Sequence, residues 1–141
     1  MSTSEKEMTF GEAIKEAISE ELRRDPNVFV MGEDVGPAGT VFKVLTGLYD
    51  EFGSERIIDT PIAEAGIMGL GVGAALTGMR PIVDIMFGDF MTLAMDQVVN
   101  QASKIHYMFG GQTKFPILYR ASVGGGTRRA AQHSQSPYSM F

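Results

Sequence analysis

The sequence contains no cysteine and only two histidines, His106 and His133. Without cysteine the chain cannot form a disulfide, bind zinc through thiolates or use a thiolate nucleophile. Two histidines are too few for a multi-histidine metal site. These absences exclude cysteine enzymes, zinc-thiolate proteins and multi-histidine metalloproteins, and they suit a reducing compartment.

Excess positive charge and long apolar runs are missing as well. The formal net charge is -5, so the chain has no surface that would neutralise a row of phosphates in a nucleic acid. The longest uncharged segment, residues 65–79, is shorter than the roughly 20 residues that span a bilayer. The first residues, 1–7, are polar and of mixed charge, unlike a signal or transit peptide. We therefore expect a soluble cytoplasmic protein that contacts neither membrane nor nucleic acid.

The chain of 141 residues has the length of one ordinary domain. We expect residues 1–8 to form a flexible N-terminus and residues 9–141 to form a single domain.

Apolar strands alternate with helical periodicity along the chain. Thr9 and Glu12 have the spacing of a capping box, which predicts a helix that ends before Asp25-Pro26. Further helices are predicted over 42–52, 64–78 and from 89 to Gly110, and short strands over 28–31, 57–58, 81–87 and 116–119. The alternation predicts an α/β fold with a mostly parallel sheet flanked by helices.

Glu64 is a single carboxylate beside a long segment without charge. A carboxyl group that is desolvated in this way can donate and accept a proton near neutral pH. The alternative is that Glu64 only starts a helix, where a negative charge is favoured by about 0.3–1 kcal/mol. The local sequence leaves both interpretations open.

The segment after Glu64 is unusually rich in glycine, at positions 66, 69, 71, 73 and 78. In a helix each interior glycine is less favourable than alanine by roughly 0.8–1.0 kcal/mol, so another backbone or a flat ligand is expected to approach closely. The alternative is an irregular loop. Residues 69–74 formally match a dinucleotide fingerprint, but they do not directly follow a strand, as that fingerprint requires. A nicotinamide-binding function is therefore a weak alternative.

Several blocks of sequence together resemble the β subunit of thiamine-diphosphate-dependent 2-oxo acid dehydrogenases. The blocks occur in the family's order from about Thr9 to the last residues. They are Gly32-Glu33-Asp34-Val35, Asp59-Thr60-Pro61-Ile62-Ala63-Glu64-Ala65-Gly66, Gly73-Ala74-Ala75, Arg80-Pro81-Ile82, Asp96-Gln97, Lys104, Tyr107-Met108-Phe109-Gly110-Gly111 and Ala131-Gln132-His133-Ser134-Gln135.

The resemblance implies a thiamine-diphosphate-binding fold of the pyrimidine-domain type and a role for five residues. Glu64 matches the glutamate that hydrogen-bonds the aminopyrimidine ring, and Phe90 matches an aromatic that lies against that ring. His133 matches a histidine directed towards the substrate, and Glu33 an acid in a tunnel between two cofactors. Ile117 matches a position whose carbonyl helps to bind a structural potassium ion in some members. The alternatives are a solvated acid for Glu33, a core side chain for Phe90 and an exposed one for His133.

The same resemblance implies a heterotetramer in which an α subunit holds the diphosphate and its magnesium. It also implies a second β subunit and a lipoyl-bearing acyltransferase as partners. The reaction would be oxidative decarboxylation of pyruvate or a branched-chain 2-oxo acid. Family members continue well past residue 141, so we expect a C-terminally truncated domain that is inactive alone. The alternatives are an acetoin dehydrogenase β subunit and an inert assembly module. Pro137, close after His133, departs from the expected pattern.

Overall fold

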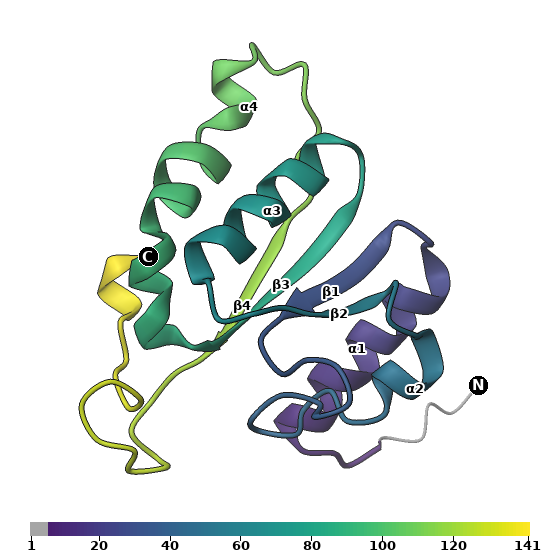
Figure 1. Cartoon of the computed structure of the whole chain (residues 1–141), viewed down its shortest axis with the longest axis vertical. Helices are drawn as coiled ribbons and strands as arrows, with labels where there is room; N and C mark the ends of the chain where they lie inside the picture. The colour runs from purple at the N-terminus through teal and green to yellow at the C-terminus, as the bar shows by residue number, and fades with distance from the viewer. Residues whose placement is uncertain (1–5) are drawn as a thin grey trace.

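A four-stranded parallel sheet forms the centre of the computed structural model, which describes residues 6–141. The strand order is β2 (Ile57–Asp59), β1 (Val28–Gly32), β3 (Arg80–Phe87) and β4 (Leu118–Ser122). The registers pair Val30 with both Ile57 and Ile82, so β1 lies between two parallel neighbours. The predicted α/β fold with a parallel sheet is confirmed (Figure 1).

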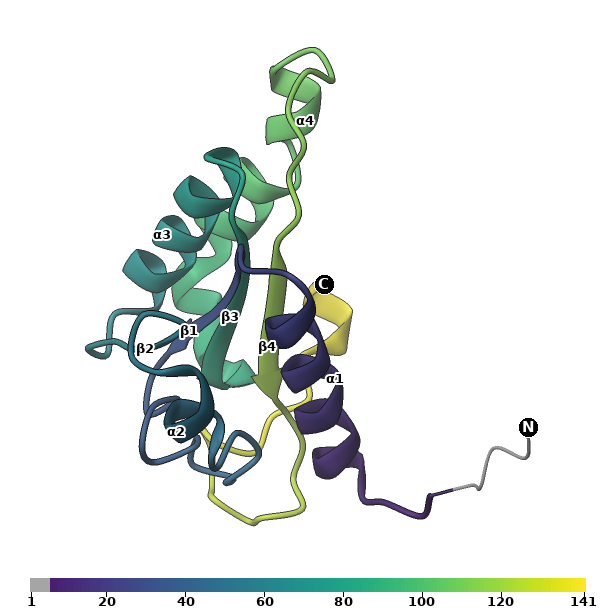
Figure 2. The same ribbon diagram turned by 90° about the vertical axis from the view of Figure 1, so that its right-hand side faces the viewer.

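Helices cover both faces of this sheet, as the two views of Figures 1 and 2 show. On one face α1 (Phe10–Arg24) and α2 (Leu48–Phe52) pack against β1 and β2 in a buried apolar cluster. On the other face α3 (Glu64–Leu76) and η1 (Gly88–Ala94) pack against β1 and β3 in a second cluster. The core is therefore divided by the sheet into two layers.

The helix α1 forms from local signals that the sequence displays. The backbone N–H of Thr9 donates to the Glu12 carboxylate (2.7 Å), and the Glu12 N–H donates to the Thr9 hydroxyl (3.3 Å), so the predicted capping box is confirmed. The helix ends at Arg24, because Pro26 cannot continue it. Residues 1–5, and with them most of the predicted flexible N-terminus, lie outside the described residues.

The glycine-rich segment is helical from Glu64 to Leu76, so the predicted helix is confirmed, two residues shorter than expected, and the alternative of an irregular loop is wrong. Gly71 shows one reason for the glycines: a Cβ at this position would lie 2.6 Å from Cγ2 of Val83 and 3.2 Å from Cδ1 of Ile117. The group that approaches closely is thus a side-chain layer of the sheet rather than a second backbone. Gly73 is different, because no heavy atom lies within 4 Å of its would-be Cβ.

Two predicted helices are shorter or more irregular than expected. The helix predicted over 42–52 is confined to Leu48–Phe52. Thr40 and Lys43 adopt left-handed φ angles of 72° and 60°, which no helix accommodates, so the residues before Gly47 form turns.

The long helix predicted after Asp89 is divided into η1, a π-helix η2 (Gln97–Ala102) and a short α4 (Ile105–Met108). Because 3₁₀ and π turns have periods other than 3.6 residues, a single buried stripe cannot continue through them. Val99, an apolar residue of this segment, is accordingly exposed. The fourth strand also begins two residues later than predicted, at Leu118.

No helix in the described part of the chain is both long and apolar enough to cross a bilayer. The cytoplasmic location expected from the sequence stays a prediction.

Candidate active site

The first two connections between strands lie on opposite faces of the sheet. This change of face creates a topological switch point at the carboxyl ends of β1 and β3. The connection from β1 to β2 passes over the α1 and α2 face, whereas the connection from β2 to β3 carries α3 over the opposite face. In open α/β sheets, ligands bind where the connections diverge in this way. The residues that follow β1, β2 and β3 are therefore the candidates for a site.

Glu33 directly follows β1 and is 4% exposed. Burial raises the pKa of Glu33 to about 6, and the negative charges of Glu64 and Asp34 add to this effect. Its Oε1 atom is buried without a hydrogen-bond partner in the described structure. Glu33 is thus a desolvated acid, not the solvated loop acid of the alternative interpretation.

The loop that carries Glu33 is held by backbone contacts to β2. The N–H of Gly36 donates to Oδ1 of Asp59 (2.8 Å), and a Cβ on Gly36 would lie 2.6 Å from Oδ2 of the same residue. The N–H of Thr60 donates to the carbonyl of Gly32 (3.0 Å), which joins the ends of β1 and β2. Any side chain at position 36 would disturb this junction.

Glu64 is the first residue of α3, and the preceding Ala63 provides no side-chain cap. The helix dipole therefore favours a negative charge at Glu64, as the structural alternative proposes. At 7% exposure, however, Glu64 is also buried, and its charge reaches Glu33. A carboxylate needed only as a helix start would be expected at the surface, so burial favours a functional role.

His133 lies among aromatic side chains near the end of β3. Its ring centroid is 4.6 Å from that of Phe87 and 5.3 Å from that of Phe90, both in edge-to-face geometry. Phe42, from the loop before α2, contacts Phe87 at 5.4 Å. The structure thus brings the predicted residues His133 and Phe90 together at the same edge of the sheet as Glu33.

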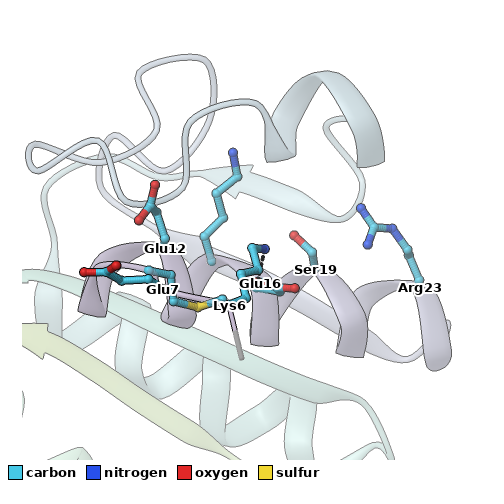
Figure 3. Close-up of a pocket in the computed structure, with 8 residues that line it drawn as sticks. Lys6, Glu7, Glu12, Glu16, Ser19 and Arg23 are labelled. Atoms are coloured by element: carbon cyan, nitrogen blue, oxygen red, sulfur yellow. Dashed lines mark hydrogen bonds and ion pairs between the residues drawn. The ribbon is translucent and has the colours of Figure 1, made fainter. Parts of the chain in front are cut away.

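A cavity of about 240 Å³ opens beside this aromatic cluster. Phe42, Phe87 and His133 line it, together with residues of the stretch from Ser122 to Thr127. A second cavity of about 310 Å³ lies along α1 (Figure 3). Charged side chains line much of it, and Lys6 pairs there with Glu16 at 2.8 Å. None of the predicted site residues lines this cavity.

Ile117 is the one predicted site residue that lies elsewhere. It precedes β4, at the amino end of the sheet, and its side chain packs against α3 near Gly71. Among the described residues, no group of three or more carboxylate, histidine or cysteine side chains could bind a metal ion. A potassium site formed by the Ile117 carbonyl stays a prediction.

Sequence reasoning missed several polar and aromatic residues of this edge. Phe87 ends a predicted strand, and that position could have identified it as a site residue. Phe42 was assigned to a helix, and Arg129 carried no local signal. Thr60 and Asp89 follow the ends of β2 and β3, and their side-chain oxygens are buried without hydrogen-bond partners in the described structure.

These unpaired oxygens provide a test of whether the expected thiamine diphosphate fits. A buried acceptor without a donor is costly and is usually satisfied by a ligand, a water or a partner. The aminopyrimidine of thiamine diphosphate supplies N–H donors and a flat apolar ring. The unpaired Oε1 of Glu33 and the buried carboxylate of Glu64 can accept such donors, and Phe90, which follows the end of β3, offers a flat apolar face. The residues present therefore fit the cofactor.

Comparison with known proteins agrees with this geometry. The family model of the transketolase pyrimidine binding domain matches residues 6–141. The chain is 48% identical over 134 residues to the 2-oxoisovalerate dehydrogenase subunit beta of Bacillus subtilis, covering 95% of this chain and 41% of the relative. It is 51% identical over 130 residues to the pyruvate dehydrogenase E1 component subunit beta of Rickettsia bellii, covering 92% and 40%.

A third relative is named for a different substrate. The acetoin:2,6-dichlorophenolindophenol oxidoreductase subunit beta of Bacillus subtilis is 47% identical over 146 residues, covering 95% of this chain and 43% of the relative. The chain therefore spans about two fifths of the length of the curated relatives it matches.

Proposed function

Since the chain belongs to the transketolase pyrimidine-binding domain family, we propose that it supplies the aminopyrimidine half of a thiamine diphosphate site. The site would belong to the β subunit of a 2-oxo acid dehydrogenase. The observation that carries the proposal is the buried pair of acids at the switch point, in which the charge of Glu64 raises the pKa of Glu33.

In this proposal, Glu64 would hold and move a proton on the cofactor. When bound, thiamine diphosphate would supply the nucleophilic carbon for decarboxylation of a 2-oxo acid. Glu64 would hydrogen-bond the aminopyrimidine nitrogen, and its burial excludes the water that would otherwise compete for that bond. Because Glu64 is the first residue of α3, a helix rather than a loop holds its carboxylate.

Phe90 would form an aromatic wall of the cofactor site, and His133 would lie on the side of the site where the substrate binds. Their edge-to-face contact at 5.3 Å holds the two rings at a fixed angle, worth about 0.5–1.5 kcal/mol beyond burial. Phe90 would lie against the aminopyrimidine, and His133 would face the reacting substrate. Glu33, with a pKa near neutrality, could exchange a proton with Glu64 or with a second site.

The partners of the chain are part of the proposal. An α subunit would hold the diphosphate and its magnesium, and a second β subunit would complete a heterotetramer. A lipoyl-bearing acyltransferase would accept the acyl group. The outer face of α3 supports assembly: it carries the exposed Gly66 and Gly73, and Leu70 on the same helix is 65% exposed. Such a face lets another helix approach closely.

Reconstitution tests this proposal. The β subunit containing this chain is mixed with an α subunit, thiamine diphosphate and magnesium, and carbon dioxide release from pyruvate and from a branched-chain 2-oxo acid is measured. The proposed function predicts release that depends on both subunits. Complex formation without turnover would instead support an inert assembly module, and turnover of acetoin alone would assign the chain to acetoin dehydrogenases.

A further inference from the structure

The loop between β4 and η3 (Tyr138–Met140) fixes a second functional group beside His133. The N–H of Gly124 donates to the carbonyl of Gln135 (2.8 Å), which closes the loop at its base. The N–H of Arg129 donates to the hydroxyl of Ser134 (2.9 Å), next to His133. These contacts hold the backbone of Arg129 at a set position relative to the imidazole.

The backbone on either side of Arg129 is strained. Arg128 has a φ of 51° and Ala130 a φ of 65°, both in the left-handed region. Non-glycine residues adopt this region at a cost of order 1–3 kcal/mol, and they do so most often at functional sites. The strain directs the Arg129 side chain back over the sheet edge, where its guanidinium meets two aromatic rings.

The guanidinium of Arg129 lies 5.4 Å from the ring centroid of Phe42 and 5.8 Å from that of Phe87. Both rings line the cavity of about 240 Å³ that His133 also lines. Phe87 therefore contacts both groups. The guanidinium of Arg129 lies 5.8 Å from its ring centroid, and the ring centroid of His133 lies 4.6 Å from it. The cation of Arg129 thus lies against two rings of a cavity that the imidazole of His133 also lines.

Arg129 has no acidic partner in the described part of the chain. The ion pairs there involve Lys6, Arg23, Arg24, Arg80 and Arg120, but not Arg129. The aromatic contacts use the faces of the rings and leave the N–H donors of the guanidinium free. A guanidinium positioned in this way matches a carboxylate, which it can bind through two parallel hydrogen bonds.

We propose that Arg129 is a specificity-determining residue that binds the carboxylate of the substrate and so selects a 2-oxo acid over an uncharged acyloin. The inference rests on the proposed function, because it assigns a substrate class to that same site. The buried acids Glu33, Glu64 and Asp89 at this edge would repel an anionic substrate. Arg129 supplies the opposite charge at the cavity where the substrate would meet His133.

The test uses the assembled α and β subunits with thiamine diphosphate. Arg129→Gln should raise the KM for pyruvate by about 10–100-fold, the range for a lost charge-assisted contact, and change kcat little. The inhibition constant of oxamate, an unreactive carboxylate analogue, should rise in parallel. Turnover of acetoin, which has no carboxylate, should stay at the wild-type level, and Arg129→Lys should show an intermediate effect.

Arg128→Gln is the matched control, because Arg128 is on the same loop and makes neither an aromatic contact nor an ion pair within the described residues. It should leave KM and oxamate inhibition within a factor of two or so of wild type. An unchanged KM for pyruvate in Arg129→Gln overturns the inference, and so does an equal loss with acetoin or in Arg128→Gln.

Failure of the proposed function would give a different experimental result from failure of the inference about Arg129. A wild-type assembly that turns over no substrate contradicts the proposed function. The role of Arg129 is then decided by calorimetric titration of oxamate into the cofactor-loaded assembly, in wild type and in Arg129→Gln. Weaker binding in the variant supports the inference, and equal binding overturns it. Arg129→Lys provides the comparison if the glutamine variant does not fold.

Discussion

The buried carboxyl groups of Glu33 and Glu64 are close enough for the charge of one to raise the pKa of the other. Glu33 follows β1 and Glu64 begins α3, so the pair is assembled from elements that meet only at the switch point of the sheet. Burial is the larger cause of the raised pKa of Glu33, and the charge of Glu64 adds to it. A cofactor that exchanges a proton would exploit this arrangement.

The raised pKa of Glu33 predicts a pH-dependent stability. In the unfolded chain a glutamate titrates near 4.5, whereas in the folded chain Glu33 titrates at about 6. The folded state therefore binds the extra proton between these values, and stability is lost as the pH rises from 4.5 to 6. Glu33→Gln removes this loss and should be more stable than wild type above pH 6, by about 1 kcal/mol after allowance for solvent screening.

Urea denaturation at pH 4, 5 and 8 measures this effect. The variant and the wild type should agree at pH 4 apart from a constant offset and diverge towards pH 8. Glu55→Gln, which changes an exposed acid, should show no such divergence. A stability difference that does not depend on pH would show that Glu33 has an ordinary environment.

The ion pair of Asp84 and Arg120 joins β3 to β4 and is almost fully buried. Burial lowers the pKa of Arg120, and only the nearby carboxylate compensates the buried charge. Arg120→Leu should destabilise the chain by roughly 3–5 kcal/mol, because Asp84 would remain buried without a partner.

The double variant Asp84→Leu/Arg120→Leu separates a lost attraction from an unpaired charge. It should be more stable than Arg120→Leu alone, because it buries no charge. Thermal unfolding of the three variants gives the comparison. If the double variant is the least stable, the pair contributes a net attraction and the expected order is wrong.

Gly71 and Gly73 lie on opposite sides of α3 and should respond differently to leucine. At Gly71 the new side chain would collide with Val83, so Gly71→Leu should lower the stability of the chain by about 1–3 kcal/mol or more. At Gly73 no atom of the chain is near, so Gly73→Leu should fold normally.

Association is the property that Gly73→Leu should change, because the outer face of α3 is proposed to pack against a partner subunit. Sedimentation of the mixed α and β subunits should show free subunits for this variant and an assembly for wild type. Gly66→Leu, two helical turns before Gly73 on the same face, should behave in the same way. Normal assembly of both variants would place the partner interface elsewhere.

Local signals made much of the fold predictable. The capping box at Thr9, the buried run of β1 and the apolar glycine-rich segment each determine their element through neighbouring residues. The acid Glu64 could be selected because it directly precedes the uncharged segment 65–79. The turns before Gly47 and the π-helix η2 could not be predicted, because they depend on backbone angles that apolar periodicity does not encode.

The aromatic part of the site was beyond sequence reasoning for a different reason. Phe42, Phe87 and Arg129 come from three segments that meet only after the sheet has formed. Each is unremarkable locally: a helix-like phenylalanine, a strand residue and a loop cation. Their contact is a product of topology, so only the structure could show that the two rings share a cavity with His133 and that Arg129 lies against them.

The most direct test of the account is the turnover of Glu64→Gln in the assembled enzyme with saturating thiamine diphosphate. Glutamine keeps the shape of the side chain but cannot exchange a proton, so folding and assembly should be retained. Carbon dioxide release from the 2-oxo acid should fall by about 10²–10⁴-fold. Turnover at the wild-type rate would contradict the proposal that this buried carboxyl group acts on the cofactor.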